Sequence, residues 1–264
     1  MNEFIKKLSS SYEIEIVELS YKKRGVNSYK LDLNGNVTQL HLYQVPLGEV
    51  DKLRPVADSL VALTLFECDI EDLEQIRSFK QLEELDLTLN TIPELSGLET
   101  LINLKKLKLS CVYMDSLREL RHLKQLEVLD LSSNIELSFD NELEELDKLI
   151  ELNLEGNDLY DIGIIGGVKS LVKLNLKECE ISEIKNLDQF LNLEELNLSG
   201  NSIEEIKGLE KLTRLKELRL NSTKIERITG LETLVKLESL DLSDTRITKI
   251  ENLKAVSYTH LRAH

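Results

Sequence analysis

Hydrophobic and polar residues follow a pattern that returns about every 22 residues along most of the chain. Residues 193–214, LEELNLSGNSIEEIKGLEKLTR, show it clearly: counting the first leucine as slot 1, aliphatic residues occupy slots 1, 4, 6, 11, 14, 17 and 20. Ten units align on this template. Their slot-1 residues are Val37, Leu60, Leu82, Leu104, Leu126, Leu149, Leu171, Leu193, Leu215 and Leu237. Such a period predicts a repeat architecture in which successive units stack on one another.

The beginning of each unit predicts a short β-strand. Leu196 and Leu198, in slots 4 and 6, would point to one face of a strand, while Glu195, Asn197 and Ser199 would point to the other. A helix would direct slots 1, 4 and 6 to widely separated sides, so it does not explain the pattern. The later aliphatic residues recur every three positions, which favours short 3-10 turns.

One unit cannot bury its aliphatic side alone, so we expect neighbouring units to stack and their strands to pair in parallel. Burying an aliphatic side chain contributes about 1.5 to 3 kcal/mol, and a unit supplies about seven, which is comparable to the entropy lost in ordering 22 residues. The predicted fold is therefore an α/β solenoid, with a parallel sheet on one side and 3-10 or short helical turns on the other.

Slot 9 predicts an internal ladder of side chains. Asparagine amides at this slot can bond the backbone groups that are left open where each strand turns. The predicted ladder residues are Asn90, Asn134, Asn157, Asn201, Cys68 and Cys179. Val45 and Val112 occupy the same slot and have no side-chain hydrogen-bonding group. We therefore expect the ladder to be interrupted, and the array weakened, at the first and fourth units.

Slot 16 holds the residue types that accept a positive φ. These are Gly97, Gly208, Gly230, Asn186 and Asn252. A left-handed turn is expected there.

Residues 1–36 do not follow the template. NEFIKKLSSS predicts a short amphipathic helix, YEIEIVEL alternates like a strand, and YKLDLNGNVTQLHL predicts a hairpin turning at Asn34 and Gly35. Because the open end of a solenoid exposes leucines and an unpaired strand, we interpret residues 1–36 as an N-terminal α+β cap.

The repeated LEELNLSGNSIEEIKGLEKLTR motif resembles leucine-rich repeats of the 22-residue class, found in the regulatory subunit of type 1 protein phosphatase and in internalins. The resemblance covers residues 37–255 and implies a right-handed horseshoe whose concave face is the parallel sheet. Members of this class bind unrelated partners, so the resemblance does not fix a function. The N-terminal segment is similar to the caps of intracellular bacterial repeat proteins, in which the array often precedes a GTPase or another signalling domain.

The repeat pattern stops near residue 255. The last nine residues, VSYTHLRAH, resemble the translated read-through of a transposase-end sequencing adapter, and Thr259 stands where the template requires leucine. We therefore interpret 256–264 as a non-native tail and exclude it from the fold. On this interpretation the natural protein continues past residue 255.

Composition narrows the classes of partner. Of the 264 residues, 41% are hydrophobic, enough for a packed core, and the net charge of −15 disfavours nucleic acid and anionic membranes. The N-terminus has no apolar signal region and no segment is apolar enough to span a bilayer. Three cysteines without metal-like spacing fit free thiols in a reducing compartment. We expect a cytoplasmic monomer.

No catalytic motif accompanies the repeats. His41 and His122 are the histidines outside the tail, and no nucleotide-binding, metalloprotease or nucleophile motif lies near them. The many carboxylates recur at solvent-facing slots, and the ladder cysteines favour core filling over nucleophilic chemistry. We expect a protein without enzymatic activity, metal or cofactor.

Candidate binding residues lie on the solvent-facing slots of the sheet. Tyr43 and Phe66, in slot 7 beside His41 in slot 5, are adjacent aromatics of the kind that anchor protein interfaces. Leu89 and Tyr113 extend this group along the rim. Asp86, Lys108 and Asp130 form a second, charged run whose alternating signs could instead satisfy one another across strands. The alternative for Tyr43 and Phe66 is that the cap folds over them.

The main functional hypothesis is a protein-interaction scaffold that binds a protein partner on the concave face. The alternative is the sensor or regulatory segment of a longer signalling protein, for example a GTPase. A secreted adhesin, by analogy with internalins, is disfavoured because the sequence lacks a signal peptide.

Overall fold

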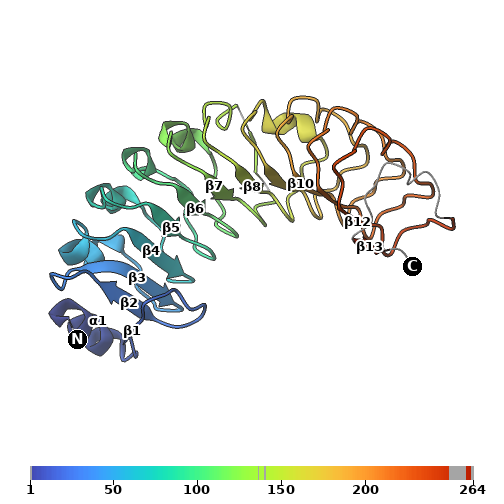
Figure 1. Cartoon of the computed structure of the whole chain (residues 1–264). Coiled ribbons are helices and arrows are strands. Elements are labelled where there is room, and N and C mark those ends of the chain that lie inside the picture. The colour runs from blue at the N-terminus through green and yellow to red at the C-terminus, as the bar shows by residue number, and fades with distance from the viewer. Residues whose placement is uncertain (1, 136, 140, 250–259, 263–264) are drawn as a thin grey trace. The chain divides into compact units, whose positions relative to one another are not determined.

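The computed structural model describes residues 2–135, 137–139, 141–249 and, for the backbone, 260–262. The chain divides into two compact units, residues 1–129 and 130–264, which are described separately below. Both are built from the same repeating coil of one short strand followed by turns (Figure 1).

The first unit begins with helix α1 (Glu3–Tyr12), which buries Ile5 and Leu8 and is capped by the side chain of Asn2. Strand β1 is shorter than expected and covers only Val17–Glu18. The preceding residues are not free to extend, because Glu13 takes a left-handed conformation and the Ile14 N–H bonds back to the Ser9 carbonyl at the end of the helix.

A hairpin follows, in which β2 (Ser28–Leu31) pairs antiparallel with β3 (Val37–Tyr43). Its turn lies at the expected Asn34 and Gly35. The carboxylate of Asp32 accepts the Asn34 and Asn36 N–H groups, and Gly35 has a φ of +82°. Asp32 therefore closes the turn through local side-chain bonds.

Strands β1 and β2 pair in parallel in the cap, and from β3 onward each repeat adds one parallel strand: β4 (Ala62–Phe66), β5 (Glu84–Asp86) and β6 (Lys106–Lys108). The register joins identical slots, so Leu40, Leu63, Leu85 and Leu107 stand in line. The chain returns through the 3-10 helices η1 (Val50–Val56), η2 (Glu74–Ser78), η3 (Leu98–Thr100) and η4 (Arg118–His122). Strand β7 (Val128–Asp130) contains the division between the units.

The second unit repeats this arrangement. Its strands are β8 (Glu151–Asn153), β9 (Lys173–Asn175), β10 (Glu195–Asn197), β11 (Glu217–Arg219), β12 (Ser239–Asp241) and β13 (His260–Arg262), paired in parallel in that order. The 3-10 helix η5 (Ile162–Ile165) lies on the opposite side. The backbone of β13 extends the sheet into the tail, with Leu261 opposite Leu240, one residue earlier than a 22-residue period would place it. Asn252 and the other residues of 250–259 lie outside the described residues.

The core is the stack of aliphatic slots that the sequence predicts. Slot-1 and slot-4 residues of both units are at most 2% exposed, and so are the slot-20 phenylalanines Phe79 and Phe190. The predicted solenoid, with a parallel sheet on one side and 3-10 turns on the other, is confirmed in each unit. We call the solvent side of the strands the sheet face and the side of the 3-10 helices the turn side.

Asparagines of slot 9 bridge neighbouring repeats from inside. The Asn90 carbonyl oxygen accepts the N–H groups of Cys68 and Ile70 at 3.0 Å each, and its amide donates to the Leu65 and Leu87 carbonyls at 2.7 Å. Asn201 makes the same four bonds in the second unit, to Cys179, Ile181, Leu176 and Leu198. The ladder therefore satisfies backbone groups of two repeats at once.

At Val112 the expected interruption is offset by the backbone. Tyr113 has a φ of +56°, and the Val112 carbonyl accepts the N–H of Ile92 in the preceding repeat at 3.1 Å. This N–H is the counterpart of the Ile70 N–H that Asn90 bonds. A left-handed residue also follows Cys68 and Cys179: the Cys179 carbonyl accepts the N–H of Leu159, at the same slot as Ile92, whereas the Cys68 carbonyl accepts the Gly48 N–H one slot later. The backbone thus replaces one of the bonds that a slot-9 asparagine makes, and the weakening of the array at the first and fourth units stays a prediction.

Left-handed backbone occurs at two slots of the repeat. At slot 16, Gly97, Gly208, Gly230 and Asn186 have positive φ, and a Cβ on Gly230 would lie 2.3 Å from the Ile206 carbonyl oxygen. Slot 8 is also left-handed in every unit, although glycine fills it only at Gly156 and Gly200. The slot-8 conformation was not expected from the sequence, because most of its residues are not the types that favour it.

Candidate functional site

Strands β3 and β4 bring three of the predicted binding residues together. His41 and Tyr43 of β3 stand opposite Thr64 and Phe66 of β4. The His41 Nδ1 atom lies 2.9 Å from the Thr64 hydroxyl, and the rings of Tyr43 and Phe66 have centroids 5.7 Å apart with an interplanar angle of 41°. The aromatic pair on the sheet face is therefore formed.

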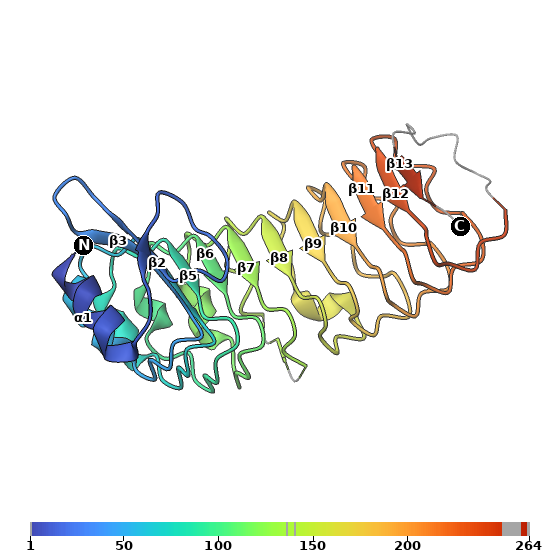
Figure 2. The same cartoon turned by 90° about the horizontal axis from the view of Figure 1, so that it is seen from below.

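This pair is not open to solvent as a whole. The segment 19–27 between β1 and β2, which we call the strap, crosses the sheet face: Lys22 Nζ donates to the Thr64 hydroxyl at 2.9 Å, and the Asn27 side chain accepts the Tyr43 N–H at 2.7 Å. Figure 2 shows this blue segment over the strands of the first unit. His41 is consequently only 4% exposed. The prediction of His41 as a surface anchor was wrong, because the strap and Thr64 enclose its ring.

Tyr43 and Phe66 are half-buried, so the covering alternative holds in part. The Tyr43 hydroxyl is buried, and burial raises the pKa of Tyr43. Burial also lowers the pKa of His41 to about 4, with Lys22 adding to the decrease and Glu84 and Asp86 opposing it. His41 is therefore neutral at pH 7.

Exposed apolar side chains continue along the carboxyl ends of the strands in repeats two to four. We call Phe66, Leu89, Cys111 and Tyr113 the apolar rim. Leu89 is 43% exposed and Tyr113 70% exposed, and both have left-handed φ values, 60° and 56°. The Leu89 N–H bonds the Ser110 carbonyl, which places Leu89 directly beside the fourth repeat. Bulky residues rarely adopt this conformation on a surface, where asparagine or glycine would adopt it with less strain.

The charged run predicted from Asp86, Lys108 and Asp130 is not a run of mutually paired charges. Asp86 pairs through Oδ2 with Lys22 at 3.2 Å, and its Oδ1 accepts the Thr88 hydroxyl at 2.7 Å. Lys108 is exposed on β6. Asp130 belongs to the second unit, where its Oδ1 accepts from Ser132 and Asn153. Asp86 and Asp130 therefore have structural contacts of their own.

A slot-5 carboxylate or amide has a structural task that the sequence reasoning missed. In six repeats its oxygen accepts the N–H of slot 7, two residues later, at 3.0 to 3.3 Å. The recurring signal was visible as Asp or Asn followed two positions later by Ser or Thr, as in Asp241 and Ser243. These side chains close the end of the strand.

In the second unit the sheet face is cross-linked by its own polar groups. Asn175 donates to the Asn153 side chain at 2.9 Å and to Glu155 at 3.1 Å, and Lys177 pairs with Glu155 at 2.7 Å. Ser199 donates to the side chain of Asn197. These polar groups of the face are therefore bonded to one another.

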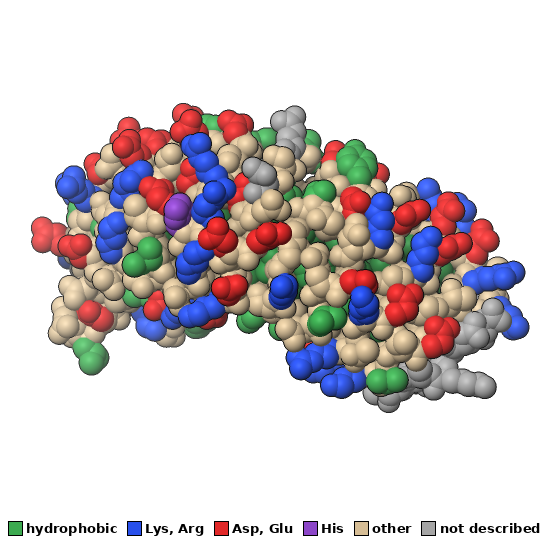
Figure 3. Space-filling view, turned by 90° about the horizontal axis from the view of Figure 1, so that it is seen from above, with side chains coloured by type: hydrophobic (Ala, Val, Ile, Leu, Met, Phe, Trp, Pro, Cys, Tyr) green, Lys and Arg blue, Asp and Glu red, His purple; other side chains and the backbone are tan. Residues whose placement is uncertain are grey.

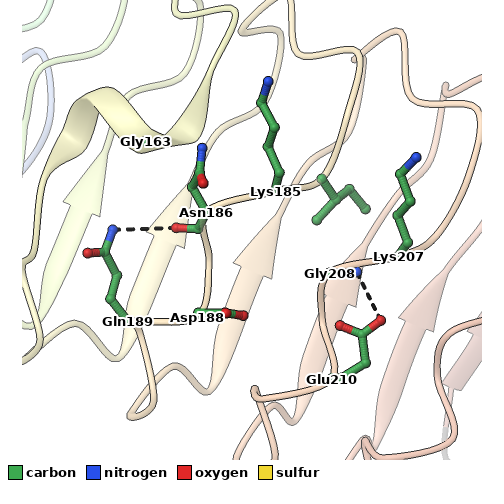
Figure 4. Close-up of a pocket in the computed structure, with 9 residues that line it drawn as sticks. Gly163, Lys185, Asn186, Asp188, Gln189, Lys207, Gly208 and Glu210 are labelled. Atoms are coloured by element: carbon green, nitrogen blue, oxygen red, sulfur yellow. Dashed lines mark hydrogen bonds between the residues drawn. The ribbon is translucent and has the colours of Figure 1, made fainter.

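The turn sides carry mixed charges. Figure 3 shows acidic and basic side chains interspersed there, with hydrophobic atoms in small separate areas. A groove in the second unit lies between the turns of two repeats (Figure 4) and is lined by Lys185, Asn186, Asp188, Lys207 and Glu210. Its charged groups pair with neighbours, as in Lys185 with Asp161 at 3.2 Å and Lys211 with Asp188 at 3.0 Å. The groove therefore has no convergent set of unpaired polar groups that would indicate a ligand site.

The two ladder cysteines have the burial and the thiol pKa of core residues. Cys68 and Cys179 are buried, and burial raises the pKa of each thiol to about 11. A thiol with this pKa is a poor nucleophile at neutral pH. Within the described residues, histidine, cysteine and acidic side chains form no cluster of three or more that could bind a metal ion, and no helix is long and apolar enough to cross a bilayer.

The repeats and the fold are similar to those of known proteins. Residues 191–233 and 213–255 match the family described as Leucine Rich repeats (2 copies). A comparison with curated proteins gives no significant match. The fold is similar to that of the internalin InlF from Listeria monocytogenes, with a TM-score of 0.62 and 19% identity over 86% of this chain and 89% of that chain.

Two other solved structures are similar over part of their own length. One is the functional domain of InlJ from Listeria monocytogenes, which includes a cysteine ladder (TM-score 0.62, 19% identity, 86% of this chain and 53% of that chain). The other is TLR13 in its complex with ssRNA13 (TM-score 0.64, 23% identity, 74% of this chain and 30% of that chain). At these identities the similarity establishes the fold and not a ligand. Residues 191–255 thus match leucine-rich repeats, and the fold is similar to the solenoid fold of internalins.

Proposed function

We propose that the protein is a non-enzymatic scaffold that binds a protein partner through the sheet face of its first unit, with the apolar rim as the anchor. The observation that supports this most is the conformation of Leu89 and Tyr113. A left-handed backbone costs a non-glycine residue about 1 to 2 kcal/mol. Here that conformation carries large apolar side chains that stay exposed to solvent instead of entering the core.

The chemistry of the rim fits a protein surface better than a small molecule or nucleic acid. Tyrosine and other apolar anchors dominate binding energy at protein interfaces. The net charge of −15 opposes a phosphate backbone. The three free cysteines support a reducing, cytoplasmic location as part of the same proposal.

The experiment first captures a partner by photo-crosslinking from a benzoylphenylalanine placed at position 113. The affinity of that partner is then measured for the double variant Leu89→Ala, Tyr113→Ala. We expect binding to weaken by at least about 2 kcal/mol, roughly 30-fold, because both anchors are removed.

Ile102→Ala is the matched control, since Ile102 is 62% exposed in the same unit but lies outside the rim. It should bind like the wild type. Wild-type affinity in the double variant, with its melting temperature unchanged, would refute the proposal.

A further inference from the structure

The strap has few anchors on the surface that it covers. Of its nine residues, 20–25 are exposed and none is buried. Tyr21 is 64% exposed. Its apolar residues Leu19 and Val26 are only half-buried, so no side chain of the strap is fully buried in the core. The strap is otherwise held by the polar contacts of Lys22 and Asn27 and by a few backbone bonds. Segments held in this way open at low free-energy cost.

Lys22 is seated in a small site made of groups from two repeats. Its ammonium group donates to the Thr64 hydroxyl and to Oδ2 of Asp86, at 2.9 and 3.2 Å. The side chain of Asp86 is only 14% exposed, and Thr64 is 1% exposed. The other Asp86 oxygen is engaged by Thr88, so Oδ2 points its charge toward Lys22. A carboxylate and a hydroxyl in this arrangement form a cation site on the sheet face.

The two cations that follow in the strap behave differently. Lys23 and Arg24 are exposed and form no ion pair with a described residue. The contrast shows that the position of Lys22 is specific and is not the general attraction of a basic segment to an acidic protein. Lys23 is therefore a matched control for Lys22.

Polar groups beneath the strap are left without partners. Among the described residues, none bonds the buried Nε2 atom of His41, and the buried Tyr43 hydroxyl meets the Gly25 N–H of the strap only outside good hydrogen-bond geometry. A buried polar group without a partner disfavours the state that buries it by about 1 to 3 kcal/mol. Closing the strap therefore gains little free energy, and the polar groups of His41 and Tyr43 can form hydrogen bonds when it opens.

We propose that the strap is an autoinhibitory segment, and that its Lys22 occupies a cation site which a lysine or arginine on an extended segment of the protein partner takes when the strap is displaced. This rests on the proposed function, because Phe66 belongs both to the covered aromatic pair and to the apolar rim. A partner segment that enters the site would contact Tyr43 and Phe66, which the strap covers in part, and then Leu89 of the apolar rim.

The test uses the strap sequence as its own probe. A fluorescent peptide LSYKKRGVN is titrated into the wild-type protein and into a variant whose residues 20–26 are replaced by glycine and serine. The peptide should bind the variant at least about 10-fold more tightly, because the tethered strap competes at high effective concentration in the wild type.

Two substitutions identify the cation site. In the strap-replaced variant, Asp86→Asn should weaken peptide binding at least about 5-fold, because it removes the charge but keeps the oxygen that accepts from Thr88. A peptide carrying Lys22→Ala should lose affinity to a similar degree, and one carrying Lys23→Ala should not. Equal binding to wild type and variant, indifference to Asp86→Asn, or no binding at about 1 mM peptide would each overturn the proposal.

Amide hydrogen exchange covers the case in which the strap-replaced variant does not fold. In the full chain, Lys22→Ala should speed exchange of the Tyr43 amide, which Asn27 holds, about 5-fold or more, whereas Lys23→Ala should not. Unchanged exchange in Lys22→Ala overturns the proposal.

Neither measurement uses the partner, so each proposal can fail separately. Peptide binding without an effect of the rim substitutions would leave the cation site standing and reject the rim as the partner surface. If the rim substitutions weaken partner binding but the strap peptide does not bind, the autoinhibitory strap is rejected and the proposed function stands.

Discussion

The sheet faces of the two units differ, although the repeats beneath them are the same. In the second unit the outward slots hold asparagine, serine and acidic residues that bond one another, as Asn153, Asn175 and Glu155 do. In the first unit the corresponding slots hold His41, Thr64, Tyr43 and Phe66, which are partly covered by the strap and end in the apolar rim.

This difference separates the residues that stabilise the solenoid from those available for binding. Outward side chains of the second unit join neighbouring strands, so they act on stability. The side chains of the rim residues Leu89 and Tyr113 are 43% and 70% exposed, and both residues have an unfavourable backbone conformation. Binding is the function expected of side chains that are retained despite that strain.

The largest expected effect tests whether the slot-9 asparagines stabilise the interiors of the two units equally. Asn90→Ala and Asn201→Ala each remove four matched hydrogen bonds to the same slots and leave two N–H groups buried without a partner. Each should lower the free energy of unfolding by about 3 kcal/mol, since a buried unsatisfied group costs about 1 to 3 kcal/mol.

Denaturant titration of both variants provides the measurement. The two losses should agree within about 1 kcal/mol, since the same bonds are deleted. A loss near zero in either variant would show that water or the backbone replaces the asparagine, as the Val112 carbonyl does one repeat later.

A smaller effect is confined to the first unit and depends on pH. The folded pKa of His41 is about 4, below the ordinary value of 6.5, because burial and Lys22 disfavour its charged form. Between these two values the unfolded or strap-open state binds a proton that the closed state does not. Stability of the closed state is therefore complete above pH 6.5 and falls as the pH drops toward 4, by about 2.5 kcal/mol at pH 4.5, since one pKa unit corresponds to about 1.4 kcal/mol.

Hydrogen exchange of the Tyr43 amide between pH 7 and 4.5, corrected for intrinsic rates, measures this loss. His41→Gln should flatten the dependence at Tyr43. A face residue of the second unit, such as Asn197 of β10, should show no such transition, because the described part of that unit has one histidine, His260 of β13, which lies three strands away. The same pH profile in wild type and His41→Gln would exclude His41 as its source.

The aliphatic slots, the strands and the ladder positions could be predicted from the sequence because each repeats with a fixed period. Ten copies define which leucines share a face, and the structure buries Leu85 and Leu196 as that register requires. Slot 16 carried its own signal, since glycine or asparagine recurs there.

The candidate site was less predictable, for reasons that lie outside the period. The path of the strap occurs once in the chain, so no repeat indicated that Lys22 would reach Asp86, 64 residues away, and that His41 would be buried. At slot 8, hydrogen bonds between neighbouring turns impose the left-handed conformation, as the bond from the Leu89 N–H to the Ser110 carbonyl does. Most units have no glycine at this slot, so the residue types there do not indicate the conformation. Backbone compensation at Val112 likewise leaves no mark in side-chain identity.

The substitution Leu89→Gly tests the central claim, that the rim is kept for binding and not for stability. Relief of the left-handed strain, about 1 to 2 kcal/mol, offsets the added entropy of the unfolded chain and the lost contacts of a half-exposed leucine. Ser222→Gly, at the same slot of the second unit, is the control and should change neither property appreciably.

The measurement pairs denaturant unfolding with titration of the crosslinked partner. We predict that Leu89→Gly changes the free energy of unfolding by less than about 0.5 kcal/mol and lowers the affinity for the partner at least about 10-fold, because only the exposed anchor is lost. A variant that is clearly destabilised and still binds the partner with wild-type affinity would contradict the account.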